Sequence, residues 1–404
     1  LSSSSAASDV YKRQAINNGQ VNYAAYTSKA SIQGTLNPFI NHLGNGITDP
    51  YIAKNTDCVP VKAELVWQDA PSLVTDIKYN SGTNGGTISF KVDKENIRQG
   101  NALIAIKDSQ NTILWSWHIW ITDENIYHTI KVTNHQNVSH DLMPIHLGWC
   151  EGEVINYAAR SCQVQFIAHG QTRLITVNQM RSTTSTQGNC TFYEWGRKDP
   201  LRPSSGYAYK NKTWYNAAGI ASTANHAVES FPFGNECIKN YIRKPDVMQK
   251  EIGGDNTYFN LWNADNNTNS NVYNDNPVTK TVYDPCPVGF AMPPSNTFTG
   301  FTTTGENVTN TVAKYNGEWN SSLPGWNFYC GPNKTGGTIF FPMTGERISS
   351  GGHLSAVGSL GHTWSATSTH SNYAHNLTLY TNYWVWPLDR FSKSAGHGVR
   401  PCLE

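Results

Sequence analysis

The stretch 104–121 constrains the fold of this chain more than any other part of the sequence. It holds two runs of β-branched and aromatic residues, 104–107 and 113–121, separated by the turn-forming residues 108–111. This pattern predicts a β-hairpin. Side chains alternate along the second strand, so its residues fall on two faces: Trp115 and Trp117 on one, and Ser116, His118 and Trp120 on the other. Because bulky side chains on both faces are seldom left exposed, we expect this strand to lie inside packed layers.

Composition narrows the classes of function that this chain of 404 residues can serve. At roughly 100–200 residues per domain, we expect two or three domains. Charged residues make up only 15% of the chain and the net charge is +1, which argues against a nucleic-acid partner. The 13 Trp and 20 Tyr, in a chain rich in Asn, Thr, Ser and Gly, are typical of a loop-rich β protein that works outside the cytoplasm.

The eight cysteines do not follow a metal-binding pattern, because no CxxC pair occurs. An even number of cysteines suits an oxidising compartment. The sequence itself leaves the connectivity of any disulfides open.

The first residues, 1–14, read LSSSSAASDVYKRQ and contain no apolar core of a signal peptide. They resemble a translated adaptor remnant, so we expect a non-native or disordered leader and an export signal that is missing from this fragment. No run of about 18 apolar residues occurs, which predicts no transmembrane helix.

Short strands between turns are predicted for residues 15–129, which favours a β-sandwich domain. Residues 130–404 are less regular and form a second predicted domain with long loops, of the kind that often serve a binding surface. Strands are predicted at 63–67, 87–92, 102–107, 127–133, 163–168, 191–195, 338–343, 362–367, 372–380, 383–388 and 398–402. The Ala-rich segment 216–226 and the segment 237–250, which Pro245 interrupts, are the two helix candidates.

Several motifs, in this order, resemble those of the fimbrillin-related surface proteins of Gram-negative gut bacteria. They are LVWQD at 65–69, ISF at 88–90, QGNALIA at 99–105, ILWSWHIWITD at 113–123, MPIHLGW at 143–149, YEWGRKDP at 193–200, DPCPVGF at 284–290 and VRPC at 399–402. The resemblance covers about residues 17–404. Ile145 and His146 stand where relatives carry an Arg-Asn pair, and Phe290-Ala291-Met292 replaces the usual Trp-Arg-Val.

The resemblance implies a mainly β protein with some α structure, in which the sandwich is followed by a C-type-lectin-like α+β domain. In that fold a cysteine near the start of the core pairs with one in the last strand, which implies a structural disulfide between Cys286 and Cys402. It also implies a protein at the cell surface, in the outer membrane or on an extracellular pilus, whose partners are other surface or pilus subunits.

Aromatic residues near the C-terminus are the best candidates for contact with a glycan: Tyr383, Trp384, Trp386 and Trp364. Rings of this kind stack on sugar faces, although packing in the core remains the alternative for at least one of Trp384 and Trp386. The cluster at Trp115–Trp120 favours core packing over a sugar shelf. Arg197 and Lys198 favour a structural turn, with Arg197 paired to an interior carboxylate, over an anion site.

Oxygen-bearing side chains gather in an Asn-rich loop and offer the ligand type that calcium prefers: Asp255, Asp265, Asn266, Asn267 and Asp275. Their spacing does not fit an EF-hand, and the calcium-binding triplets of sugar-binding C-type lectins are absent. A solvated loop is therefore the favoured interpretation. We expect no metal and no cofactor.

Three functions follow as hypotheses. The first is a surface or pilus-associated adhesion protein that recognises a glycan or a host protein through its C-terminal domain. The second is a structural fimbrial subunit without a ligand of its own, joined to neighbours by β-strand donation. The third is an enzyme, because the lectin-like fold also hosts a formylglycine-making oxidase. The chain has neither a G-x-S-x-G nor an H-E-x-x-H motif, so we expect no enzyme.

Overall fold

The computed structural model describes residues 34–152, 154–206, 209–250, 257–266, 272–369, 372–381 and 383–404, together with the backbone of 2–4, 16–17 and 20–21. The protein is mainly β, as predicted, and most of its sheets are antiparallel. Of the predicted leader, only Ser2–Ser4 is described, as strand β1. The rest of the leader lies outside the described residues.

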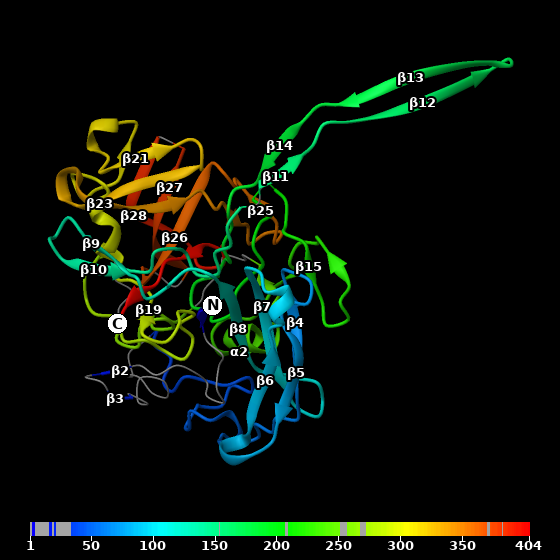
Figure 1. Cartoon of the computed structure of the whole chain (residues 1–404). Helices are drawn as coiled ribbons and strands as arrows, with labels where there is room; N and C mark the ends of the chain where they lie inside the picture. The colour runs from blue at the N-terminus through cyan, green and yellow to red at the C-terminus, as the bar shows by residue number, and fades with distance from the viewer. Residues whose placement is uncertain are drawn as a thin grey trace.

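The predicted hairpin is confirmed at the centre of a six-stranded sheet (Figure 1). Strands β7 and β8 pair in antiparallel register, with Ile104 opposite Trp117. The order in the sheet is β1, β8 (Ile113–Thr122), β7 (Gly100–Lys107), β4 (Lys62–Gln68), β15 (Trp214–Tyr215) and β16 (Ala221–Ser222). A separate hairpin, β5 (Thr75–Asn80) and β6 (Thr87–Lys91), packs its apolar residues against Ile104, Ile119 and Ile121.

The remaining described strands form smaller sheets, most of them in the second half of the chain. Four strands are ordered β19 (Phe290–Ala291), β30 (Cys402–Leu403), β10 (Ser139–Leu142) and β9 (Ile130–Thr133). Five are ordered β20 (Val308–Thr309), β28 (Trp384–Ser392), β27 (Tyr373–Tyr380), β26 (Leu360–Ser368) and β29 (Gly398–Val399). Three are ordered β21 (Gly317–Asn320), β22 (Gly325–Gly331) and β23 (Thr335–Pro342). Short pairs are β2 (Ile16–Asn17) with β3 (Gln20–Val21), β17 (Val228–Glu229) with β18 (Met248–Gln249), and β24 (Glu346–Arg347) with β25 (Leu354–Ser355).

The largest hydrophobic cluster joins both halves of the chain, because its buried residues run from Leu36 to Val399. Strand β8 is buried on both faces, as predicted. One face packs under the β5–β6 hairpin, and the other meets the second half, where Trp120 Nε1 donates a hydrogen bond to the Trp149 carbonyl. Strands β15 and β16 extend the same sheet from beyond residue 130, so the core continues across the predicted domain boundary.

Two sequence predictions of local structure are wrong. Segment 216–226 is not a helix, because Gly219 has a φ of 74° and the Asn216 side chain accepts hydrogen bonds from the Ala218 and Ile220 N–H groups, which forms a turn between β15 and β16. Segment 191–195 forms only single bridges, from Phe192 to Leu201 and from Tyr193 to His397. The other helix prediction is confirmed in part: helix α2 (Asn235–Arg243) ends before Pro245. No helix in the described part of the chain is long and apolar enough to span a membrane.

Candidate functional site

A long β-ribbon projects from the body of the molecule (Figure 1). It consists of β11 (Val154–Tyr157) paired with β14 (Ser182–Ser185), and β12 (Arg160–Ala168) paired with β13 (Gln171–Gln179). At about 3.4 Å per residue, the outer pair alone extends about 30 Å. Every residue from 154 to 185 is exposed, and among the described strands neither β12 nor β13 has a second neighbour.

The ribbon has one apolar face. Residues directly opposite each other share a face, and Cys162 faces Val177 while Val164 faces Ile175. Phe166 continues this face, and its side chain is 54% exposed. Arg173 stands opposite Phe166, so this face carries a cation near its outer end. The opposite face carries the polar residues Ser161, Gln163, Gln165, Thr176 and Asn178, and it has Ile167 and Leu174 near the outer end of the ribbon. We call the face that carries Cys162, Val164, Phe166, Ile175 and Val177 the ribbon's apolar face.

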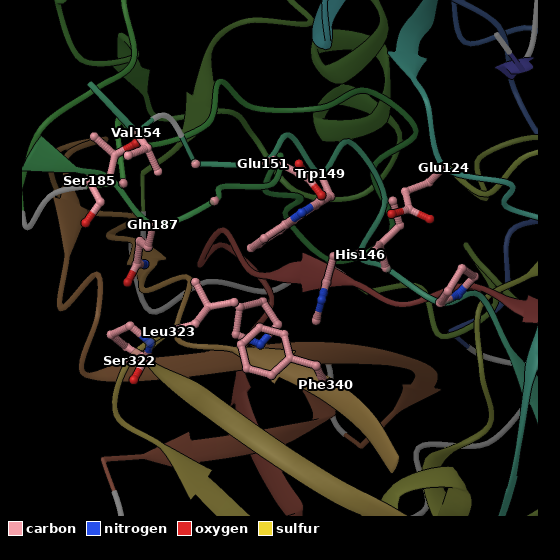
Figure 2. A pocket seen from close by; sticks show the side chains of 18 of the residues that line it. Glu124, His146, Trp149, Glu151, Val154, Ser185, Gln187, Ser322, Leu323 and Phe340 are labelled. Carbon is pink, nitrogen blue, oxygen red and sulfur yellow. The ribbon is translucent and has the colours of Figure 1, made fainter. Parts of the chain in front are cut away.

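A pocket of about 640 Å³ lies at the root of the ribbon (Figure 2). Val154 and Ser185, from the first and last strands of the ribbon, lie at one end, and Glu124 lies at the other. Trp149 and Phe340 line its middle. Its lining is mostly apolar, with Ile145, Leu323 and several prolines.

The charged residues that line the root pocket differ in how deeply they are buried. Glu151 is exposed and Glu124 is half-buried, whereas Arg400 is buried. Arg400 Nη2 donates to the Phe340 carbonyl at 2.6 Å and to His146 Nδ1 at 3.0 Å. Burial lowers the pKa of Arg400 to about 9, and burial together with the Arg400 charge holds the pKa of His146 well below its usual range. His146 therefore serves as a hydrogen-bond partner of Arg400.

Three of the four predicted glycan-contact residues lie together on the surface. Trp384 and Trp386 stack with ring centroids 4.7 Å apart, and Tyr380 lies 5.0 Å from Trp384. Tyr383 is 50% exposed and lies 6.3 Å from Tyr380. We call these four rings the aromatic shelf. Neither tryptophan is fully buried, because both point away from the face that holds the buried Val385.

Trp364 does not belong to the shelf. It is buried, its ring stacks on His397, and its Nε1 donates to the Tyr193 carbonyl at 2.8 Å. The prediction that it contacts a ligand is therefore not supported, because no solvent reaches the ring. His118 is likewise part of the core, where its Nε2 lies 2.9 Å from Asn101 Oδ1.

The Arg197 turn is structural, as the sequence favoured. Gly196 has a φ of 85°, and a Cβ there would lie 2.5 Å from Leu261 Cδ1. Arg197 Nη1 donates to Glu194 Oε2 and to the Val247 carbonyl, and both side chains of this ion pair are fully buried. Burial raises the pKa of Glu194 to about 7, although the Arg197 charge opposes this shift.

The disulfide between Cys286 and Cys402 that the resemblance implies is not formed. All eight cysteines lie among the described residues, and no disulfide joins Cys286 to Cys402. Cys286 packs in the large cluster that joins the two halves, whereas Cys402 packs in a second cluster with Val132 and Leu142. Burial raises the pKa of the Cys402 thiol to about 12.

The predicted oxygen ligands for calcium have other partners where they are described. Asp275 accepts hydrogen bonds from Asn134 and Asn296 and lies 3.1 Å from His140 Nε2. Asp265 accepts from Thr279 Oγ1. Asp255 and Asn267 lie outside the described residues, so the structure does not test the whole set.

One group of side chains with metal-ligand atoms was missed by sequence reasoning: Glu346, His362 and His397. Among the residues that the structure describes, this is the one such group of three, and its ligand atoms lie within 4.8 Å of one another. Burial holds the pKa values of both histidines well below their usual range. No local spacing signals the group, because its members come from three separate segments.

Comparisons with protein-family models, with curated proteins and with solved structures found no match to this chain. The family resemblance therefore stays a prediction from the motifs.

Proposed function

We propose that this chain is a subunit of a cell-surface or pilus assembly, and that the ribbon joins it to a neighbouring subunit. The observation that carries this proposal is the exposed apolar face of the ribbon. An isolated two-stranded hairpin is marginally stable in water, and a row of exposed Val, Ile and Phe side chains is costly without a partner. The unpaired strand edges offer backbone hydrogen bonds for β-augmentation.

The motifs of the fimbrillin-related proteins support the same location. On this proposal the sheet of β4, β7 and β8, with the β5–β6 hairpin, is the sandwich, and the second half is the lectin-like domain. The protein acts at the cell surface, in the outer membrane or on an extracellular pilus, and it is not an enzyme.

The partner that we propose is a second copy of the chain, which receives the ribbon at its root pocket. Between residues 154 and 185 the ribbon carries Arg160, Arg173 and Arg181 but no Asp or Glu. Two ribbons would therefore repel each other, which disfavours pairing of apolar face with apolar face. The root pocket instead combines an apolar lining with the carboxylates of Glu124 and Glu151, whereas its one cation, Arg400, is buried and bonded to the Phe340 carbonyl and His146. The arginines of the ribbon thus match the carboxylates of the pocket, and the apolar face of the ribbon matches the apolar lining of the pocket.

Sedimentation velocity over a range of concentrations tests the proposal. We compare the full chain with a variant in which residues 158–181 are replaced by Asn-Gly. Tyr157 and Ser182 are directly opposite, so a two-residue turn closes this shortened hairpin. The full chain is expected to form concentration-dependent assemblies that weaken with salt, and the shortened chain to stay monomeric with unchanged thermal unfolding.

Matched face variants identify the contact surface. Val164→Ser with Ile175→Ser alters one directly opposed pair on the apolar face, and Gln163→Ser with Thr176→Ser alters the neighbouring pair on the polar face. Only the first should reduce assembly. Glu151→Lys tests the pocket and should weaken assembly as well. The proposal is contradicted if the full chain stays monomeric or if the shortened chain assembles equally well. If Glu151→Lys leaves assembly unchanged, the ribbon binds a surface other than the root pocket.

The aromatic shelf supports a second candidate function, glycan binding, since stacked and partly exposed rings offer faces to a sugar. In a glycan-array screen of the full chain, Trp386→Ala is expected to weaken binding by about 1 kcal/mol, roughly fivefold in Kd. Tyr373→Ala, at the far end of β27, is the control and should leave binding unchanged. Absence of binding by the wild type, or equal loss in both variants, would argue against this function.

A further inference from the structure

Glu346, His362 and His397 are brought together by backbone contacts between three segments. Glu346 lies in β24, His362 lies in β26, and His397 immediately precedes β29. Single bridges join Gly345 to Gly361 and Arg347 to Gly396, so each ligand candidate lies next to a bridge. His397 Nε2 lies 3.7 Å from Glu346 Oε2.

Both imidazoles bury nitrogen atoms that have no hydrogen-bond partner among the described residues. These atoms are His362 Nε2 and both ring nitrogens of His397. The two rings stack 4.1 Å apart, and Phe391 and Trp364 pack against the His397 ring, so the faces of the rings are covered. An unsatisfied buried nitrogen costs about 1–3 kcal/mol. Groups of this kind in a folded protein point to a missing ion or water.

A second layer of side chains orients His362. Thr378 Oγ1 donates to Asp389 Oδ2 at 2.6 Å, so its oxygen is left to accept a hydrogen bond from His362 Nδ1, 2.9 Å away. Nδ1 then carries the ring proton, and Nε2 presents a lone pair. The side-chain amide of Asn376 lies 3.0 Å from the same Nδ1. As placed, Asn376 Nδ2 also donates to Thr378 Oγ1 and to the Leu377 carbonyl, so a proton on His362 Nδ1 requires this amide to turn and give up these two bonds in exchange for a partner for its oxygen.

We propose that Glu346, His362 and His397 bind one divalent transition-metal ion, with zinc as the best match. Two imidazoles and one carboxylate are a donor set that zinc accepts, with a water molecule as the fourth ligand. The Glu346 side chain is 14% exposed, which gives the ion and this water a path. The Thr378–Asp389 pair supplies the outer hydrogen bonds that metal-binding histidines require.

The ion ties three segments together and has a structural role. The root pocket and the second cavity, which lies at His140 and Asp275, are not lined by these three residues, which favours a structural role over a catalytic one. Zinc–ligand distances of about 2.0–2.2 Å keep ligand atoms within roughly 4 Å of one another, so the group closes by about 1 Å on binding. The histidine rings turn out of their parallel stack, because two in-plane lone pairs must converge on one ion.

Titration of the intact chain with Zn²⁺, and with Co²⁺ as a spectroscopic probe, tests the site. One ion per chain is expected, with a rise in the thermal unfolding temperature and a Co²⁺ visible spectrum typical of tetrahedral nitrogen and oxygen ligands. Glu346→Gln and His397→Gln should abolish binding. Thr378→Val, which alters a positioning residue, should weaken affinity about 10–100-fold while the Co²⁺ spectrum is retained.

Controls separate this site from exposed thiols and histidines. His353→Gln and Cys162→Ser alter exposed residues and should leave stoichiometry and affinity unchanged. Glu346 is at the edge of the group, so Glu346→Gln is expected to fold even if His397→Gln does not. The proposal is overturned if the folded wild type binds no ion, or if Glu346→Gln binds Zn²⁺ as tightly as the wild type.

Discussion

Arg197→Met is expected to destabilise the protein by about 3–5 kcal/mol at pH 8, because it leaves the buried Glu194 carboxylate without its partner. The loss should shrink to about 1–3 kcal/mol at pH 5, where the Glu194 carboxyl is neutral and the variant lacks the hydrogen bonds from Arg197 to Glu194 and to the Val247 and Lys244 carbonyls. Denaturant unfolding at the two pH values measures both numbers.

The sign of this pH dependence follows from Glu194. Its pKa is raised to about 7 in the folded protein, so the folded state binds a proton more tightly than the unfolded chain does. This group therefore favours folding at low pH and opposes it as pH rises from about 4.5, its ordinary value, through the folded pKa. Removal of the Arg197 charge raises the pKa of Glu194 further. The pH range over which ionisation of Glu194 opposes folding then extends to higher pH.

A double variant provides the control. Glu194→Gln keeps an acceptor for the Gln249 N–H and removes the titrating carboxyl, so Glu194→Gln with Arg197→Met should lose the pH dependence between pH 5 and 8. An equal loss of stability at both pH values in the single Arg197 variant would show that the ion pair does not govern this region.

Lys280→Met should destabilise the protein by about 3–5 kcal/mol, because the Lys280 ammonium is buried and its removal leaves its partners unsatisfied. Lys280 Nζ donates to the carbonyls of Cys286, Pro287 and Phe290 and lies 3.7 Å from Asp284 Oδ1. Equilibrium unfolding in urea measures the change.

Lys244→Met is the matched control, since Lys244 pairs with Glu229 where both side chains are more than 40% exposed. Exposed pairs contribute about 0–1 kcal/mol, so this variant should change stability little. If Lys280→Met were as mild as Lys244→Met, the carbonyl cradle around Lys280 would not stabilise the segment 284–290.

The motifs that carry the family resemblance have structural roles in this chain. Arg197 of the 193–200 motif, Asp284 of the 284–290 motif and Arg400 of the 399–402 motif are all buried and bonded to neighbouring segments. Motifs of this kind predict a fold, because each fixes the path of the backbone. They are weak predictors of a ligand, because all three charges are buried and bonded to neighbouring segments, and of the three only Arg400 lines the root pocket.

The sequence predicted regular structure well where side-chain alternation was strong. The β7–β8 hairpin is an example. Its strands carry apolar residues on both faces, and such strands are stable only inside packed layers. The error at 216–226 arose because alanine content favoured a helix, whereas Asn216 bonds to the backbone of the following turn and Gly219 adopts a positive φ. Local hydrogen bonds of one residue outweighed helix propensity.

The candidate sites were less predictable than the fold. The strand 163–168 was predicted, but alternation cannot show whether a neighbouring layer covers an apolar face, and here none of the described residues does. Tyr383, Trp384 and Trp386 were predicted because they are close in sequence. Glu346, His362 and His397 were not, because only the folded backbone brings them together.

The hydrophobic cluster that runs from Leu36 to Val399 has a consequence for biosynthesis. A nascent chain emerges from its N-terminal end, and domains commonly fold as they emerge. Strands 62–122 cannot bury their sheet fully in this way, because residues that cover it, such as Trp149, Tyr283 and those of helix α2, are synthesised after the strands. The first half must wait with its tryptophans uncovered, which makes the newly made chain dependent on a chaperone or on rapid completion to avoid aggregation.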